Sequence, residues 1–361
     1  MTAKQPAALR VPLAPLTSLQ LGGAAEHFVR AEDRATLIDA LRWARARSLP
    51  VTLLGGGSNV VVSDDGVPGL VIAMATRGVT RTRENERVRV RAEAGEPWDA
   101  LVDACVNDAL AGIECMSGIP GLVGATPIQN VGAYGQEVAD TITSVEVLDR
   151  TTLEVKTLAP QACGFAYRHS AFKADPARYV VLAVELELVP DGAPTLRYAE
   201  LVQALGARTK ASLAETRATV LQLRAKKSML LDPSDENGRS AGSFFTNPIV
   251  SAAQADDVMQ RALQLGVAQQ AADVPRYPQP DGRVKLAAGW LIERSGTRRG
   301  ERHGTVGIST RHALALVHHG GGTAADLIAL AREVQARVAR AFAIDLAAEP
   351  VFVGFAKPPL G

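Results

Sequence analysis

The sequence has few cysteines, and their spacing lacks the pattern of a disulfide framework or a zinc site. Cys105, Cys115 and Cys163 are the three cysteines among 361 residues, and no two of them form a C-x-x-C pair. An odd number of widely spaced cysteines indicates neither disulfides nor zinc and fits a reducing compartment. We therefore expect a cytoplasmic protein.

Net charge and long apolar runs are also lacking. The formal net charge is +1, from 39 lysines and arginines and 38 acidic residues. Without a basic excess, no attraction to nucleic acid or to an anionic membrane is expected. No apolar run approaches the roughly 20 residues of a membrane helix, and the first residues lack the apolar core of a signal peptide. We expect small-molecule partners, no nucleic-acid or membrane partner, and a monomer.

Hydrophobic residues make up 47% of the chain, as in a globular protein. The first half alternates strand and helix patterns, including a helix in 31–50 with Leu37, Leu41 and Ala44 on one face. Short strands are predicted on both sides of a Gly-Gly-Gly turn. From about Leu221 onward the chain is richer in helices. Helical patterns cover 251–266, 284–296 and 323–344, with a short strand at 313–317.

Two glycine-rich loops are the first candidates for a binding site. "LLGGGSNVVVSD" places Gly55, Gly56 and Gly57 between two apolar runs, followed by Ser58 and Asn59. Consecutive glycines let backbone N–H groups converge on an anion. Neither the dinucleotide fingerprint nor the P-loop spacing is present, and a simple tight turn is the alternative reading.

The second loop is "SGIPGLVGATPIQNVGAYG", from Ser117 to Gly135, which has no clear period. Glycine at this density lets the backbone approach a large planar or phosphorylated ligand, although a compact surface loop would look similar. Two such loops together favour a dinucleotide cofactor bound mainly by backbone groups. The predicted cofactor-binding residues are Gly55, Gly56, Gly57, Ser58, Asn59, Ser117, Gly118, Ile119, Pro120, Gly124, Ala125, Thr126 and Gly132.

Six motifs in order give the chain a specific resemblance. They are "LLGGGSNVVVSD", "SGIPGLVGATPIQNVGAYGQEV", "YRHSAFK", "AGSFFTNP", "KLAAGWLIE" and "HALALV". Together they resemble the UDP-N-acetylenolpyruvoylglucosamine reductase family of peptidoglycan precursor synthesis. The resemblance extends from about Ser18 to Gly354. It implies non-covalent FAD, NADPH as reductant and a role in cell-wall biogenesis.

The resemblance also implies an α+β fold. A two-lobed FAD-binding domain of the vanillyl-alcohol-oxidase (PCMH) type would be followed by a C-terminal α+β substrate-binding domain. The expected boundaries are 18–80 for the first lobe, 81–220 for the second lobe and 221–345 for the substrate domain. A C-terminal strand within 346–356 is expected to return near the active site.

Three residues match the catalytic positions of the family. Arg168 in "AYRHSAFK" matches an active-site arginine, whose guanidinium can grip a carboxylate with two hydrogen bonds. Ser243 matches the proton donor, because an enolate-type carbanion is basic enough to take a proton from a hydroxyl. Glu349 matches a glutamate that assists the intermediate. Here the chain departs from the family pattern, and a register aligned on Glu-Pro would leave that position apolar.

Substrate recognition is expected from Tyr198, Lys227, Asn247 and Arg294, which lie at or near family substrate positions. Lys226 is a neighbour that could replace Lys227, both lysines could be a solvated helix end, and Asn247 could be a turn residue before proline. Thr246 and Arg294 stand where relatives often have lysine and glutamine.

No metal is expected, because His318 and His319 have no third ligand at a usable spacing and are interpreted as loop residues. Two other functions remain open. The first is another FAD-dependent oxidoreductase of the same fold, although many such oxidases tether flavin through His or Cys, which "GGGSN" and "SGIPG" lack. The second is a nucleotide-sugar-binding protein without catalysis.

Overall fold

The chain forms two compact units in the computed structural model, which describes residues 7–206 and 211–360. The first unit contains the described residues within 1–11, 25–57 and 68–230. The second contains 12–24, 58–67 and the described residues from 231 onward. Each unit is therefore assembled from segments that are distant in sequence. The division of the FAD-binding part into lobes at residue 80, and the start of the substrate domain at 221, stay predictions.

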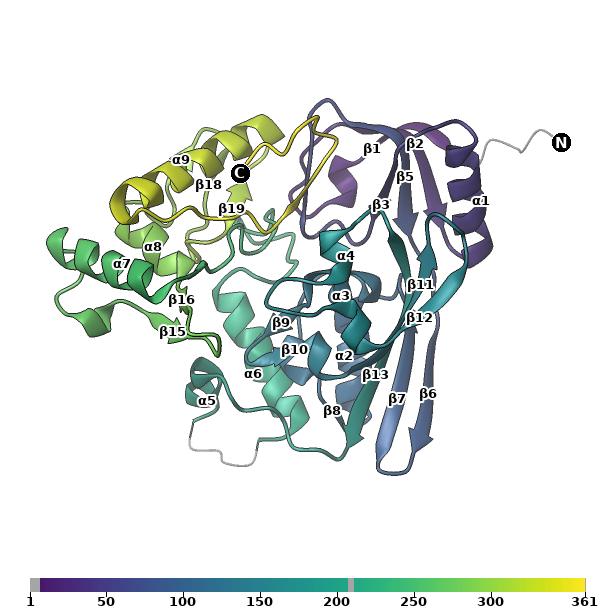
Figure 1. Cartoon of the computed structure of the whole chain (residues 1–361), viewed down its shortest axis with the longest axis horizontal. Helices are drawn as coiled ribbons and strands as arrows, with labels where there is room; N and C mark the ends of the chain where they lie inside the picture. The colour runs from purple at the N-terminus through teal and green to yellow at the C-terminus, as the bar shows by residue number, and fades with distance from the viewer. Residues whose placement is uncertain (1–6, 207–210, 361) are drawn as a thin grey trace. The chain divides into compact units, whose positions relative to one another are not determined.

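A four-stranded sheet in the first unit has the order β1-β2-β5-β3 and carries helix α1 (Figure 1). Its strands are β1 (Ala8–Pro12), β2 (Ala24–Ala31), β3 (Val51–Leu54) and β5 (Val67–Met74). Helix α1 (Arg34–Arg45) begins where Asp33 accepts a hydrogen bond from a backbone amide of the first turn. Its predicted face, Leu37, Leu41 and Ala44, is buried in a core shared with the strands. The predicted helix is confirmed.

The larger sheet of the first unit is antiparallel, with the order β12-β11-β13-β7-β6, and β8 pairs with β13 (Figure 1). The strands are β6 (Val79–Glu84), β7 (Arg87–Glu93), β8 (Leu110–Ala111), β11 (Ile142–Asp149), β12 (Val155–Leu158) and β13 (Tyr179–Pro190). Val88, Val90 and Ala92 alternate along β7 and are buried. They belong to the same apolar core as residues of helix α2 (Trp98–Asn107).

Short elements complete the first unit. The helices are α3 (Thr126–Gln129), α4 (Ala171–Ala174), α5 (Ala199–Leu205) and α6 (Leu213–Lys226), and the strands are β9 (Gly132–Ala133) and β10 (Gln136–Glu137). Single 3-10 turns cover Glu114–Met116, Val123–Ala125, Val138–Asp140 and Pro160–Cys163. Ser212 and Glu215, three residues apart, form a capping box that opens α6. The glycine-rich stretch, for which the sequence showed no period, is therefore a series of one-turn elements.

The second unit combines helices with small sheets. Its helices are α7 (Ala252–Gln264), α8 (Ala288–Arg294) and α9 (Ala324–Phe342), with a 3-10 turn at each of Ala14–Leu16 and Ala271–Asp273. Its strands are β4 (Val60–Val62), β14 (Ile249–Val250), β15 (Arg276–Pro278), β16 (Val284–Leu286), β17 (Arg302–His303), β18 (Val306–Ile308), β19 (Leu316–His318) and β20 (Val351–Val353). They form the sheets β14-β16-β15, β17-β18-β19 and β20-β4, the last parallel.

Two elements of the second unit differ from their predictions. The short strand predicted at 313–317 is β19, which covers only Leu316–His318. The pattern over 284–296 predicted a helix throughout, but its first three residues form β16, and the helix begins only at Ala288. The pairing of Val284 with Val250 and with Pro278 explains the difference, because these tertiary contacts override the local pattern. Helices α7 and α9 are confirmed. None of the described helices is long and apolar enough to cross a membrane.

Candidate active site

The two glycine-rich loops approach each other within the first unit. A Cβ atom placed on Gly56 would lie 2.8 Å from the Cα of Gly121, so the backbones of the two loops are in direct contact. Gly57 and Gly118 have φ angles of +66° and +72°, which side chains rarely tolerate. A surface made of backbone amides without side chains suits a phosphorylated, planar cofactor. Gly55 to Gly57 and Gly118 are therefore suited to FAD, and their contact with it stays a prediction.

Two hydroxyl groups of the second loop donate hydrogen bonds to nearby backbone carbonyls. Ser117 Oγ donates to the carbonyl of Glu114 at 2.6 Å, and Thr126 Oγ1 donates to the carbonyl of Val123 at 2.8 Å. Both serine and threonine are buried. Their side chains hold the loop in shape, and we expect any contact with a cofactor to come from their backbone atoms.

The loop is also anchored by an ion pair. Gly118 N donates to Asp99 Oδ1 at 2.5 Å, and Arg217 donates to both oxygens of Asp99 at 2.6 and 3.0 Å. Burial disfavours the charged carboxylate, but the hydrogen bonds from Arg217 and Gly118 outweigh it and lower the pKa of Asp99. Asp99 thus stays ionised and fixes the start of the second loop.

Arg168 lies in a tight turn of the first unit. Ala166 and His169 form an antiparallel bridge, and Arg168 between them has a φ of +51°. Its guanidinium donates to the carbonyls of Asn130 at 3.3 Å and Gly132 at 2.9 Å. The turn therefore delivers the guanidinium to the second glycine-rich loop. A left-handed conformation is costly for arginine and persists where neighbouring contacts require it.

Tyr198 and Lys227 lie together in the same unit. The Tyr198 ring meets the Tyr134 ring edge to face at 5.5 Å, and Lys227 Nζ lies 5.9 Å from the centre of the Tyr134 ring. Lys227 Nζ also pairs with Glu200 Oε2 at 2.6 Å. Burial raises the pKa of Tyr134 to about 12, so its hydroxyl stays protonated. Lys226, the alternative cation, is exposed.

Ser243 and Glu349 are brought together in the second unit. Phe245 and Ala348 form an antiparallel bridge, and Glu349 N donates to the carbonyl of Phe244 at 2.9 Å. The backbone of Glu349 therefore lies beside the residue that follows Ser243. Ser243 is half-buried and follows Gly242, which has a positive φ. The two residues after it, Phe244 and Phe245, are buried, and the centres of their rings are 5.3 Å apart.

The other predicted ligands of the second unit have different surroundings. Asn247 Oδ1 accepts a hydrogen bond from Ala288 N at 2.9 Å and so caps helix α8. Its Nδ2 group is the part of the amide that suits a ligand acceptor. Arg294 is exposed at the last residue of the same helix. Asn59 binds the C-terminal strand, since its carbonyl accepts from Val351 N at 3.0 Å.

Several residues that shape the site were not predicted. Asp99, Asn130 and Glu200 each contact a predicted site residue, yet they appear in the sequence as ordinary polar residues of helices or loops. Their roles depend on pairings across 19 to 38 residues, and no local pattern predicts such contacts. Asn130 carries one usable signal: asparagine is common where a helix ends in a left-handed conformation.

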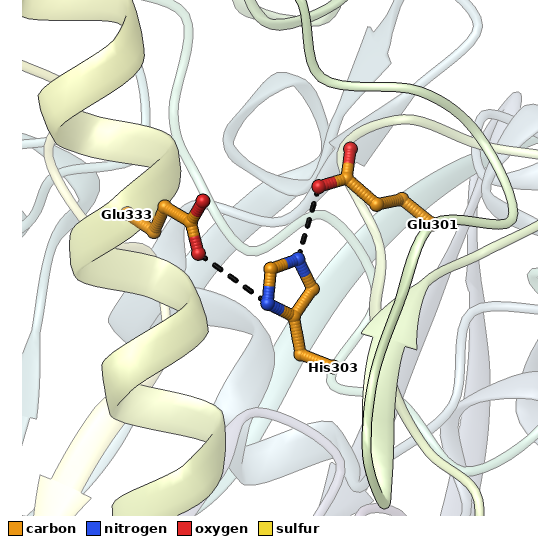
Figure 2. A group of neighbouring side chains, drawn as sticks. All are labelled: Glu301, His303 and Glu333. Carbon is orange, nitrogen blue, oxygen red and sulfur yellow. Dashed lines mark hydrogen bonds and ion pairs between the residues drawn. The ribbon is translucent and has the colours of Figure 1, made fainter.

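Among the residues that the structure describes, one group of side chains has a spacing that could hold a metal ion: a histidine between two glutamates. Figure 2 shows His303 between Glu301 and Glu333. Its Nε2 atom lies 2.9 Å from Glu301 Oε1, and its Nδ1 atom lies 3.3 Å from Glu333 Oε2. Arg337 on α9 also pairs with both glutamates. The carboxylates therefore already have cationic and hydrogen-bonding partners, and the group links the β17 strand to helix α9. His318 ends strand β19 rather than lying in a loop as predicted, and its two ring nitrogens bind the Leu19 carbonyl and the Gly322 amide.

Comparison with known proteins gives matches along nearly the whole chain. The family model described as "FAD binding domain" matches residues 25–157, and "UDP-N-acetylenolpyruvoylglucosamine reductase, C-terminal domain" matches 232–353. The UDP-N-acetylenolpyruvoylglucosamine reductase of Thermobifida fusca is 48% identical over 351 residues, covering 96% of this chain and 98% of that protein. Its namesake from Streptomyces avermitilis is 49% identical, covering 95% and 94%.

A solved structure has the same overall organisation. The crystal structure of the UDP-N-acetylenolpyruvylglucosamine reductase from Thermus caldophilus matches with a TM-score of 0.64 and 26% identity, covering 96% of this chain and 98% of that one. The predicted fold class, a PCMH-type FAD-binding domain followed by an α+β domain, is confirmed. The chain is thus a flavoprotein oxidoreductase, and it belongs to the UDP-N-acetylenolpyruvoylglucosamine reductase family.

Proposed function

We propose that this protein uses NADPH to reduce UDP-N-acetylglucosamine enolpyruvate to UDP-N-acetylmuramate. The observation that carries the proposal is the pairing of residues 244–246 with 347–349, which brings the backbone of Glu349 beside the residue after Ser243. This pairing supports the register in which Glu349, rather than Pro350, fills the third catalytic position. A cytoplasmic monomer is part of the proposal.

FAD would be held by the backbone of the two glycine-rich loops, with Ser58 and Asn59 contributing at the end of the first loop. When bound, it supplies hydride transfer between NADPH and the enolpyruvyl double bond. Neither "GGGSN" nor "SGIPG" contains a histidine or cysteine that could tether it. Flavin should therefore leave the protein on denaturation; flavin that stays attached to the chain would contradict this part of the proposal.

Arg168, Ser243 and Glu349 would act on the charge that develops in the substrate. Hydride addition leaves negative charge on the carbon beside the carboxylate. The Arg168 guanidinium would bind that carboxylate and stabilise the growing charge. Ser243 Oγ would then donate its proton to the basic carbon. Glu349 would assist the intermediate from the segment that pairs with residues 244–246.

Recognition of the nucleotide sugar would depend on Tyr198, Lys227, Asn247 and Arg294. Lys227 offers a cation for the diphosphate, and Tyr198, exposed by 44%, offers a ring that can cover the sugar. Asn247 would donate its Nδ2 group to the uridine side. Arg294 would contribute a further positive charge near the end of helix α8.

The change Ser243→Ala tests the proposal. NADPH should still reduce the flavin of this variant within about threefold of the wild-type rate. Reoxidation of that flavin by the enolpyruvyl sugar should slow by about 10²–10⁴-fold, the usual value of general acid catalysis. Both rates are measured by anaerobic stopped-flow absorbance of the flavin.

Ser295→Ala is the matched control, because Ser295 is a half-buried serine of the same unit whose hydroxyl binds the Ile292 carbonyl. It should leave both rates unchanged. Equal slowing of both half-reactions in Ser243→Ala would make Ser243 a structural residue. A wild-type protein that NADPH reduces but the sugar does not reoxidise would refute the proposed reaction itself.

A further inference from the structure

Asn130 is a buried residue in the last third of the second glycine-rich loop. It is 1% exposed and ends helix α3 with φ 42° and ψ 64°. Asparagine is among the few residues with a side chain that adopt this left-handed conformation readily. The conformation turns the chain directly from α3 into the strand at Gly132.

The Asn130 side chain ties this loop to the turn that carries Arg168. Its Nδ2 group donates to the carbonyl of Ala166 at 3.1 Å and to Glu137 Oε2 at 2.8 Å. Its Oδ1 atom accepts from Ala139 N at 3.3 Å. The amide is thus bonded on both sides, and its orientation is fixed.

The backbone of the same residue receives the guanidinium. Arg168 Nη1 donates to the Asn130 carbonyl, and Nη2 donates to the carbonyl of Gly132, two residues further on. Lys173 Nζ strengthens the connection, since it donates to both the Arg168 carbonyl and Gln129 Oε1, at 3.0 and 3.1 Å. The path of residues 129–132 therefore determines where the guanidinium lies.

We propose that Asn130 is a positioning residue for Arg168. It holds the 166–169 turn through its side chain and the guanidinium through its carbonyl, and it acts on the substrate only through Arg168. This inference rests on the proposed role of Arg168 at the substrate carboxylate. An arginine with positive φ needs such external support, because its own conformation is unfavourable.

The change Asn130→Gly tests this role. Glycine keeps the left-handed backbone but removes the amide. We expect flavin content and flavin reduction by NADPH to stay within about threefold of wild type. Reoxidation by the enolpyruvyl sugar should slow by about 10–10²-fold, the size expected for a small misplacement of a catalytic group. Asn85→Gly, at an exposed left-handed asparagine of the β6–β7 turn, is the matched control and should change neither rate.

A double variant separates positioning from an independent effect. In an Arg168→Ala background, Asn130→Gly should cause no further slowing, because its effect passes through the missing guanidinium. If the slowing caused by Asn130→Gly were the same in the Arg168→Ala background as in the wild type, the inference would be overturned. If Arg168→Ala alone reoxidises at the wild-type rate, the proposed role of Arg168 fails instead.

A second substitution covers the case in which Asn130→Gly does not fold. Asn130→Asp keeps the shape and the acceptor for Ala139 but cannot donate to Ala166, and it should show the same split between the two half-reactions. Loss of bound flavin together with a lower unfolding midpoint in both variants would assign Asn130 to the folding of the loop and overturn the positioning role.

Discussion

Arg168 and Ser243 are held in place by different kinds of structure. Arg168 lies in a strained turn, and its guanidinium is directed by hydrogen bonds to the carbonyls of Asn130 and Gly132. Ser243 lies in a segment without regular secondary structure, which is fixed by the backbone bridge at Phe245 and by the fully buried rings of Phe244 and Phe245. The first unit thus relies on polar contacts to orient its candidate catalytic group, whereas the second relies on packing.

This difference predicts different sensitivities. A hydrogen bond contributes direction, and its loss moves the side chain while the core stays intact. Loss of packing removes stability before it changes geometry, because a large cavity weakens the whole unit. Substitutions in the two regions should therefore separate effects on rate from effects on stability.

Phe244→Ala should have the largest effect. Phe244 is 0% exposed and packs against Phe245 and Phe352 at 5.3 and 6.5 Å. Its removal should lower the free energy of unfolding by about 3–5 kcal/mol, measured by urea denaturation. Tyr277→Ala, at a 51% exposed ring of the same unit, is the control and should change it by less than about 0.5 kcal/mol. Equal values for the two would show that packing does not hold the Ser243 segment.

Arg168→Lys should come next, and it should act on rate. Lysine keeps the charge but cannot donate to two carbonyls in the fixed geometry of a guanidinium. We expect reoxidation by the sugar to slow by about 10²-fold, or about 2.7 kcal/mol, with little change in stability. The control is Arg178→Lys, because Arg178 lies 4.8 Å from the centre of the Tyr179 ring just as Arg168 lies 5.5 Å from the centre of the Tyr167 ring. A large loss of stability in Arg168→Lys would show that the contacts of Arg168 hold the fold together as packing does around Ser243, and would contradict the proposed difference between the two regions.

Glu301→Gln should have the smallest effect and tests whether charge has a share in the stability of the second unit. Hydrogen bonds from Arg337 lower the pKa of Glu301 to about 2, from an ordinary value of 4.5. We expect a loss of about 1–3 kcal/mol in the free energy of unfolding at pH 7.

The pH dependence follows from the lowered pKa of Glu301. The carboxylate contributes its full stability above about pH 4.5, and this contribution decreases as the pH falls towards 2. The difference between wild type and Glu301→Gln should therefore shrink over that range in urea denaturation curves. Glu293→Gln, at an exposed pair with Arg299, should cost less than about 1 kcal/mol. A difference that stays constant down to pH 2 would show that the ion pair does not stabilise the unit.

The sequence predicted the elements with strong local signals. Helix α1 follows its apolar face, and α6 begins at its capping box. The resemblance predicted the fold class and the family. Strand β16 was missed because its pairing partners are 6 to 10 and about 35 residues away, and the helical pattern beside it extended over the strand.

The candidate site could be predicted only in part, for the same reason. Motifs indicated Ser243 and Glu349, which are separated by more than 100 residues, and the backbone bridge between their neighbours Phe245 and Ala348 became visible only in three dimensions. Asn247 shows the limit most clearly. Its position suggested a ligand contact or a turn, while the structure gives its oxygen to the first amide of α8. Asp99 lies outside the six motifs, and Asn130 lies inside one of them without being predicted as a site residue.

Strand β20 gives the second unit an unusual order of assembly during synthesis. Its parallel partner β4 is made nearly 300 residues earlier, and the buried Val61 of β4 belongs to the same apolar core as Phe342 and Leu346. The early segments 12–24 and 58–67 can therefore be buried only when the segment from 231 onward has been synthesised. A fragment that begins at 231 would lack part of its own core and the Asp64 carboxylate that caps α9. Strand β4 can pair with β20 only after residues 351–353 have been synthesised, so the core of this unit is completed late.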